Sequence, residues 1–342
     1  RSGRSNVVTF EHEMRTASSE RLELRADLAR AIGTDQLVVV YQPIVSIDNG
    51  ALLGAEALVR WDHPERGRLS PAMFIPLAEE AGLIAAIDAQ VRRRACKDLA
   101  AWRQEIPAAH HLYVTTNISV KELHSDDLME SVLRDLAETG LPASSLVVEV
   151  TESNLLEDSD LVRERMAAMR SHGIRIAIDD FGTGYSSLGY IHSFEFDLLK
   201  IDRSFVVGLS RTTNQRIVSA VLDLAADLDA GVVAEGIETP TQESQLLDLG
   251  CTTGQGFLYA RPSPAGQFRR LLTTSERLRA DRGRFARDRA RAQRSACGSR
   301  REQRPVPPVQ QPTVDPPVGH PHAEHQLPGA CIAAVERSHL RG

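Results

Sequence analysis

The feature that most constrains the fold of this chain is a regular alternation of short apolar runs with amphipathic segments. From about residue 112 onward, each apolar run, such as Ser145 to Val150, is followed by a helical pattern that often ends at a glycine. With two runs nearer the N-terminus, about eight strands alternate with helices over roughly 250 residues, which is the pattern of a (β/α)8 barrel. A doubly wound open sheet is the alternative fold that the same alternation allows.

The alternation places the expected elements along the chain. Strands are expected over 36–44, 52–60, 112–118, 145–150, 174–179, 198–201, 231–234 and 256–259. Helices are expected over 19–33, 71–81, 83–105, 126–139, 159–172, 187–192, 214–228, 241–249 and 265–272. Because the first strand precedes any crossover helix, the pattern leaves its direction open.

Composition divides the chain into three parts. Residues 1–18 are unpatterned and resemble a linker or the end of a preceding domain, and 19–273 form the expected barrel. Residues 276–304 hold 11 Arg against 4 acids, and 305–328 hold 8 of the 17 Pro. The tail 274–342, Arg-rich and then Pro-rich, is therefore expected to be disordered.

Charge and cysteine usage narrow the class of protein. The net charge is −6 although the tail is basic, so the barrel is acidic and does not suit binding to a nucleic acid polymer. The four cysteines show no disulfide or metal spacing, which favours a reducing, cytoplasmic setting. No apolar run is long enough to span a bilayer, although a missing N-terminal region could tether a longer protein to a membrane.

Polar side chains stand at or near the ends of most of the expected strands. They are Glu56, Asn117, Glu149, Asp179, Asp180, Lys200, Glu235 and Gln255. In a parallel barrel the carboxyl ends of the strands meet on one face, so these side chains would share a cleft. Each acid alone fits a helix cap or a rim salt bridge, but five carboxylates together need cations that one lysine cannot supply.

Two divalent metal ions would meet that need. They would activate a water for in-line attack on a phosphoryl group, with Lys200 holding the water or the phosphate. For Asp179 and Asp180 alone, a metal site and a helix N-cap are equally good interpretations. Arg60 fits either a phosphate contact or a surface salt bridge. No GxxxxGK[ST] loop is present, so nucleoside triphosphate hydrolysis has no support.

A set of motifs then makes the chain similar to a known family. The motifs are YQPIV (41–45), GAEALVRW (54–61), FIPLAEE (74–80), NIS (117–119), EVTES (149–153), DDFGTGYSSL (179–188), KIDRSFV (200–206), AEGIET (234–239) and GQGFLYARP (254–262). Over about residues 20–272 the chain resembles the EAL-domain family of bacterial cyclic-di-GMP phosphodiesterases, in the order of its motifs.

The resemblance implies a TIM-like barrel whose first strand runs antiparallel to the others. It implies hydrolysis of cyclic-di-GMP to linear pGpG with two Mg²⁺ or Mn²⁺ ions, inhibited by Ca²⁺. The implied metal ligands are Glu56, Asn117, Glu149, Asp179 and Asp180, with Asp179 bridging the two ions. Lys200 would contact the nucleophilic water, and Glu235 would lie beside the metals through water.

The resemblance also implies roles around the metals. The implied substrate contacts are Gln42, Leu58, Arg60, Pro76 and Gln255. Glu152 would brace the loop that starts at Asp179. Asp202 and Glu238 would support the metal ligands without binding the metals themselves. A homodimer would form near the loop from Asp179 to Leu188, and a GGDEF or sensor domain would precede this fragment, which itself has no membrane contact.

Two other functions stay open beside the active phosphodiesterase. One is a catalytically silent cyclic-di-GMP receptor of the same fold. The other is an unrelated two-metal phosphohydrolase, because a fold does not fix a function.

Overall fold

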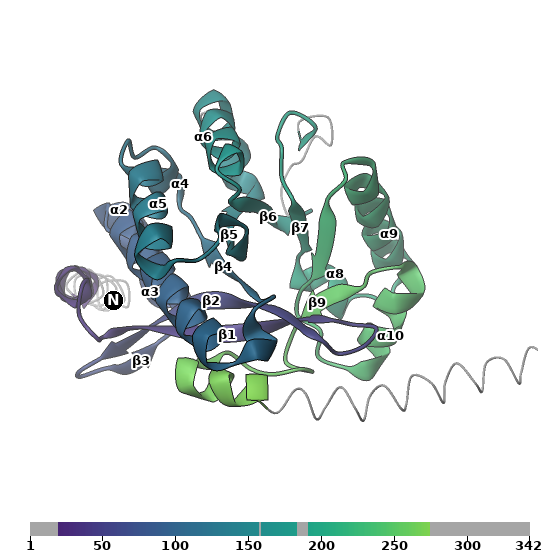
Figure 1. Ribbon diagram of the computed structural model, residues 1–342, viewed down its shortest axis with the longest axis horizontal. Helices are drawn as coiled ribbons and strands as arrows, with labels where there is room; N and C mark the ends of the chain where they lie inside the picture. Colours follow the sequence, from purple (N-terminus) through teal and green to yellow (C-terminus); the bar gives the residue numbers. More distant parts are fainter. Residues whose placement is uncertain (1–19, 157–158, 183–190, 274–342) are drawn as a thin grey trace, which may run out of the picture. The chain divides into compact units, whose positions relative to one another are not determined.

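The computed structural model describes residues 20–156, 159–182 and 191–273 (Figure 1). The chain divides into two compact units, Arg1–Ala292 and Gln293–Gly342, and all described residues belong to the first. The linker expected over 1–18, the tail over 274–342 and most of the helix expected over 187–192 lie outside the described residues.

The described strands form a closed barrel. Its eight strands are β1 (Leu37–Ser46), β2 (Leu52–His63), β4 (Tyr113–Asn117), β5 (Leu146–Thr151), β6 (Arg175–Phe181), β7 (Leu198–Ile201), β8 (Gly231–Ala234) and β9 (Thr253–Gln255). β1 pairs antiparallel with both β2 and β9, and every other pairing around the ring is parallel. This closure confirms the barrel with an antiparallel first strand and excludes the open sheet.

Helices surround these strands (Figure 1). They are the helix over 20–31, α2 (Pro71–Ala81), α3 (Ile84–Glu105), α5 (Leu128–Thr139), α6 (Ser159–Ser171), α9 (Thr212–Asp227), α10 (Pro240–Leu249) and the helix over 265–273. α3 shows why they form: Ile84, Ile87, Val91 and Ala95 recur at helical spacing and are buried. Within the described ranges, no helix is both long enough and apolar enough to cross a membrane.

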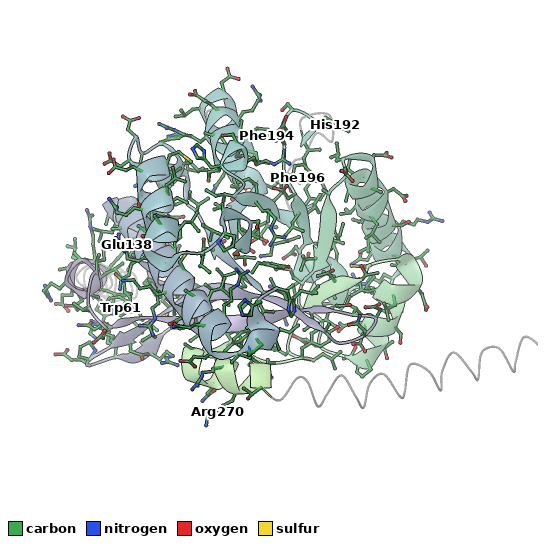
Figure 2. The ribbon with its side chains drawn as sticks, in the orientation of Figure 1. Trp61, Glu138, His192, Phe194, Phe196 and Arg270 are labelled. Carbon is green, nitrogen blue, oxygen red and sulfur yellow. The ribbon has the colours of Figure 1, made fainter. Side chains whose placement is uncertain are left out.

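The hairpin of β1 and β2 continues past the level of the other strands. β2 pairs with β4 only from Gly54 to Ala57, whereas it pairs with β1 as far as Trp61. Trp61, labelled in Figure 2, is fully buried and packs edge-on against Phe74 of α2, with ring centroids 5.7 Å apart. The extended hairpin therefore forms a fixed wall beside one end of the barrel.

Three local predictions were wrong. β1 does not end at Ile44, because Pro43 is paired in register with Ala55 and the strand runs on to Ser46. The last strand is β9, Thr253–Gln255, and the segment 256–259, expected as a strand, lies beyond it as a turn. The loop expected after β2 contains the short strand β3 (Gly67–Leu69), which pairs with β2.

Several short elements were not expected at all. They are α4 (Val120–Leu123), α8 (Arg203–Val207), the strand β10 (Ser263–Pro264) and the 3-10 turns η1 (Pro107–Ala109), η2 (Ala143–Ser145) and η3 (Glu152–Leu156). Each is too short to show a periodic pattern in sequence.

Candidate functional site

The strand period of two builds the site in layers. A small apolar cluster of Val147, Ala177 and Val233, with Ile44 and Tyr113, fills the barrel interior. Side chains two residues further along a strand share the same face. Glu149, Asp179 and Glu235 therefore stand one layer nearer the carboxyl ends of β5, β6 and β8.

Lys200 of β7 lies among these carboxylates. Its ammonium Nζ is 2.7 Å from Oε1 of Glu235, 3.0 Å from Oε2 of Glu149 and 3.1 Å from Oδ1 of Asp179. Oε1 of Glu56 is 3.7 Å away. The lysine is only 2% exposed, so one buried cation faces four carboxylates from four other strands or strand ends.

Gln255 closes this group from β9. Its amide Nε2 donates to Oε2 of Glu56 at 2.6 Å and to Oε1 of Glu235 at 3.1 Å. Because β9 ends at Gln255, this residue stands at the carboxyl end of its strand, like Glu149 and Lys200. The strand expected over 256–259 would have placed Gln255 before its start, whereas the observed strand β9 places Gln255 at its carboxyl end.

Burial and mutual repulsion shift the proton affinities of the cluster. Burial, reinforced by Glu56 and Asp179 and opposed by Lys200, raises the pKa of Glu149 well above its usual range. Burial likewise raises the pKa of Glu235 to about 8. Burial alone would lower the pKa of Lys200, but the surrounding carboxylates outweigh it and the pKa is raised. The lysine is therefore charged at neutral pH.

Asp180 and Glu152 belong to the turn that follows Asp179. The Asp180 amide donates to Oδ1 of Asp179 at 2.9 Å, and the Gly182 amide donates to Oε2 of Glu152 at 2.8 Å. Partial burial, together with Asp179, raises the pKa of Asp180. Glu152 thus contacts the loop that the resemblance assigns to it, as far as Gly182, where the described part of the loop ends.

The residues expected to contact substrate lie on the β1–β2 wall and beside it. Gln42 is the register partner of Glu56 and reaches the carbonyl of Ala260 at 3.5 Å. Leu58 and Arg60 follow Glu56 on the same face of β2. The Arg60 guanidinium is half-buried and donates from Nη1 to the carbonyl of Val59 at 2.7 Å.

A cavity of about 300 Å³ opens next to this wall. Leu58 and Asn117 line it, together with Ile75 of α2 and Asp88 of α3. Pro76, the neighbour of Ile75, is exposed on α2. A larger cavity of about 500 Å³ lies between β1 and α3, but none of the strand-end carboxylates lines it.

The remaining expected residues stand at the edge of the site. Asn117 ends β4 and is exposed, in register with Glu149. Asp202 caps α8 by accepting from the Ser204 amide at 2.9 Å, and Glu238 pairs with Arg203 at 2.7 Å. These two acids therefore order the segments that follow Lys200 and Glu235.

The donor set suits hard divalent cations. Oε1 of Glu149 is buried and accepts no hydrogen bond from the described residues, so a costly polar atom is left for another partner. In the described part of the chain, no three His, Cys, Asp or Glu side chains have the spacing of a formed metal centre. The Lys200 ammonium lies among the acids instead. Carboxylate and amide oxygens are nevertheless the ligands that Mg²⁺ and Mn²⁺ prefer, so the residues fit.

Sequence reasoning missed Asp88. Its buried carboxyl group accepts through an oxygen from the amide of Ser119 at 2.9 Å, so α3 holds the segment that follows Asn117. The signal was that Asp88 falls among Ile84, Ile87 and Val91 on the apolar face of α3, where an acid needs a partner.

Comparison with protein families decides the classification of this barrel. Residues 25–262 match the sequence model of the family described as the EAL domain. The chain belongs to the EAL domain family. The match covers all eight barrel strands, which agrees with the extent expected from the motifs.

Two relatives with assigned names are similar to this chain over more than three quarters of its length. The EAL domain is 41% identical over 269 residues to the bifunctional diguanylate cyclase/cyclic di-GMP phosphodiesterase MucR of Pseudomonas aeruginosa, covering 78% of this chain and 38% of MucR. It is 38% identical over 272 residues to the cyclic di-GMP phosphodiesterase NbdA of the same species, covering 79% of this chain and 34% of NbdA. The chain spans about a third to under half of the length of the curated relatives it matches.

Solved structures agree with the EAL assignment. The PaMucR phosphodiesterase in complex with c-di-GMP is 40% identical with a TM-score of 0.68, covering 72% of this chain and 99% of that one. The EAL enzyme Bd1971, bound to cAMP and cyclic-di-GMP, is 31% identical with a TM-score of 0.71, covering 75% of this chain and 70% of that one.

Proposed function

We propose that this EAL domain is a metal-dependent phosphodiesterase that hydrolyses cyclic-di-GMP to linear pGpG and so lowers this second messenger in bacterial signalling. The observation that carries the proposal is the group of four carboxylates around Lys200, three buried and Glu235 partly buried, in a barrel related to named cyclic di-GMP phosphodiesterases. Four carboxylates around one lysine do not stabilise the fold at the barrel mouth, because buried charges cost free energy unless they are fully paired.

The carboxylates are the proposed metal ligands. Glu56, Asn117, Glu149 and Asp179 would hold one ion, and Asp179 and Asp180 the other. Two bound Mg²⁺ or Mn²⁺ ions supply Lewis acidity for the phosphoryl oxygens and lower the pKa of water. Ca²⁺, which is larger and tolerates irregular coordination, is expected to bind without supporting turnover.

The protein side chains then handle the substrate and the proton. Lys200 donates hydrogen bonds to the attacking water, and Glu235, whose Oε1 is 2.7 Å from Nζ of Lys200, would lie beside the metals through water and accept its proton. Gln255 keeps Glu56 and Glu235 apart at fixed positions. The water oxygen bonds to phosphorus as the P–O3′ bond breaks, which leaves the 5′-phosphate and free 3′-hydroxyl of pGpG.

The wall of β1 and β2 is the proposed substrate platform. Gln42, Arg60 and the backbone at Leu58 and Pro76 would contact the dinucleotide, with Arg60 pairing with a phosphate. Glu152 would keep the Asp179–Asp180 turn in place through the Gly182 amide.

The full protein is proposed to contain more than this barrel. The relatives are longer, and the name of MucR includes a diguanylate cyclase, so we expect a GGDEF or sensor domain before residue 19. Dimerisation near the loop from Asp179 to Leu188 and a cytoplasmic location stay predictions.

Product analysis tests the proposal. The full chain incubated with cyclic-di-GMP and Mg²⁺ or Mn²⁺ should release pGpG, and Glu56→Ala should lower the rate more than about 100-fold, because it removes a ligand. Glu138→Ala changes an exposed acid on α5, labelled in Figure 2, and should leave the rate unchanged. Binding of cyclic-di-GMP without any pGpG would instead identify a receptor.

A further inference from the structure

The short helix α8 lies between two glycine turns of the site. It begins at Arg203, directly after Lys200, Ile201 and Asp202. A Cβ placed on Gly182, in the turn after β6, would lie 3.0 Å from Cε2 of Phe205. A Cβ placed on Gly236, in the turn after β8, would lie 2.2 Å from Cγ of Arg203. Because neither glycine has a side chain, the side chains of Phe205 and Arg203 in α8 can occupy the space beside them.

The Phe205 ring and Glu152 hold Gly182 from different elements. The ring lies on the side of Gly182 where a side chain would stand, with Cζ 3.1 Å from the ideal Cβ position. The amide of the same glycine donates to Oε2 of Glu152 at 2.8 Å. Gly182 has a φ of +93°, a backbone conformation that residues with side chains rarely adopt. Glycine adopts it freely, so the contacts with Phe205 and Glu152 are what fix the backbone here.

Gly182 lies two residues after Asp180, which has an unusual backbone angle. Asp180 has a φ of +55°, and among the described residues only Asp229 is another non-glycine residue with positive φ. L-residues rarely adopt this region unless the surrounding structure holds them there. At the same position the Asp180 amide donates to Oδ1 of Asp179 at 2.9 Å, so the backbone of Asp180 is also tied to the preceding carboxylate.

We propose that Phe205 is a positioning residue for the second metal ion. Its ring keeps Gly182 in place, and Gly182 keeps Asp180 in the left-handed conformation that presents its carboxylate beside that of Asp179. The inference rests on the proposed function, because it needs the metal site, and it adds a residue that is not among the proposed metal ligands or substrate contacts.

Phe205 packs against the core as well as against Gly182. It is partly buried and lies against the main apolar core, in which its neighbour Val206 is fully buried. The three atoms nearest the ideal Cβ position of Gly182 all belong to the Phe205 ring. Val206 is therefore the matched control that measures the effect of core packing alone.

Direct Mn²⁺ binding to the full chain without substrate tests the role. Calorimetric titration should give two ions per wild-type chain. Phe205→Ala should weaken the weaker site about tenfold or more, which is the usual loss when a residue supporting a ligand is removed. The stronger site should be unchanged, and Phe205→Leu should recover most of the affinity. Val206→Ala should lower the melting temperature but leave both affinities unchanged.

The outcomes distinguish the inference from the proposed function. A wild type that binds two Mn²⁺ and forms pGpG, with Phe205→Ala binding both ions equally well, overturns the inference alone. The same affinity loss in Val206→Ala also overturns it, because the effect would then be general loosening. A wild type that binds fewer than two Mn²⁺ overturns both.

Discussion

Lys200 is the residue on which the charge balance of the site depends. One buried ammonium faces four carboxylates at 2.7 to 3.7 Å, so at least some of them keep a proton or require another cation. Metal binding would supply that cation and release protons from groups such as Glu235. The same lysine therefore serves the metal-free protein as a counter-ion and the proposed enzyme as a donor to water.

Replacing the single residue Arg60 distinguishes substrate binding from the chemical step. Its guanidinium stands two positions past Leu58, on the wall and not among the carboxylates. Arg60→Ala should raise KM for cyclic-di-GMP roughly 10- to 100-fold, the worth of a charge-assisted hydrogen bond, with kcat changed less than about threefold. Steady-state kinetics of pGpG formation measures both.

The control for this prediction lies on the adjoining hairpin. Arg68 of β3 is exposed and pairs with Asp62 at 2.6 Å, so Arg68→Ala removes a guanidinium without touching the site. An Arg60→Ala variant that lost kcat but kept KM would assign Arg60 to the transition state and refute a simple binding role.

At the scale of elements, α3 is tied to the carboxyl end of β4. Asp88 on α3 accepts the Ser119 amide, two residues past Asn117. Burial, then the nearby Glu122, raises the pKa of Asp88 to about 7, against the opposing effects of Ser119 and Arg92. The carboxyl group therefore keeps its proton in the folded chain at pH values where the unfolded chain, with a pKa of about 3.9, has lost it.

This difference predicts a pH dependence of stability. Because the folded pKa is raised, the stabilisation is fully present below about pH 4 and is lost as pH rises toward 7. Asp88→Asn cannot titrate, so its free energy of unfolding should fall less over this window, by up to about 1.4 kcal/mol per pH unit. Urea unfolding at pH 5 and pH 7 in metal-free buffer measures the difference.

An exposed acid provides the comparison. Glu138→Gln removes a titrating group from the surface of α5 and should keep the wild-type pH profile. Parallel profiles for wild type and Asp88→Asn would show that Asp88 is already ionised in the folded protein.

How well the elements could be predicted follows from their length and periodicity. α2 was expected and found over Pro71–Ala81, because eleven residues with a Pro start and a Gly end give clear signals. β9 was misplaced by three residues, because Thr253–Gln255 contains a glycine and little apolar pattern. The five-residue α8, which carries Phe205, gave no signal at all.

The strand-end side chains could be predicted because parallel strands bring their carboxyl ends together. Glu149, Asp179 and Glu235 needed only strand order and period. The contact of Gly182 with Phe205 and the Asp88–Ser119 hydrogen bond depend on three-dimensional packing, which a single sequence does not contain.

At the scale of the whole molecule, closure of the barrel is what makes the site. β1 pairs with β2 on one side and β9 on the other, so Glu56 and Gln255 lie close enough for a 2.6 Å hydrogen bond although 199 positions separate them. An open sheet with the same strands would leave these two residues on opposite edges.

The most direct test of the account is the behaviour of Asp179→Asn in the full chain. Removing the bridging charge should leave the fold intact, reduce bound Mn²⁺ from two ions to one or none, and abolish pGpG formation from cyclic-di-GMP. A variant that bound two Mn²⁺ and formed pGpG at the wild-type rate would contradict the assignment of the strand-end carboxylates as a two-metal site.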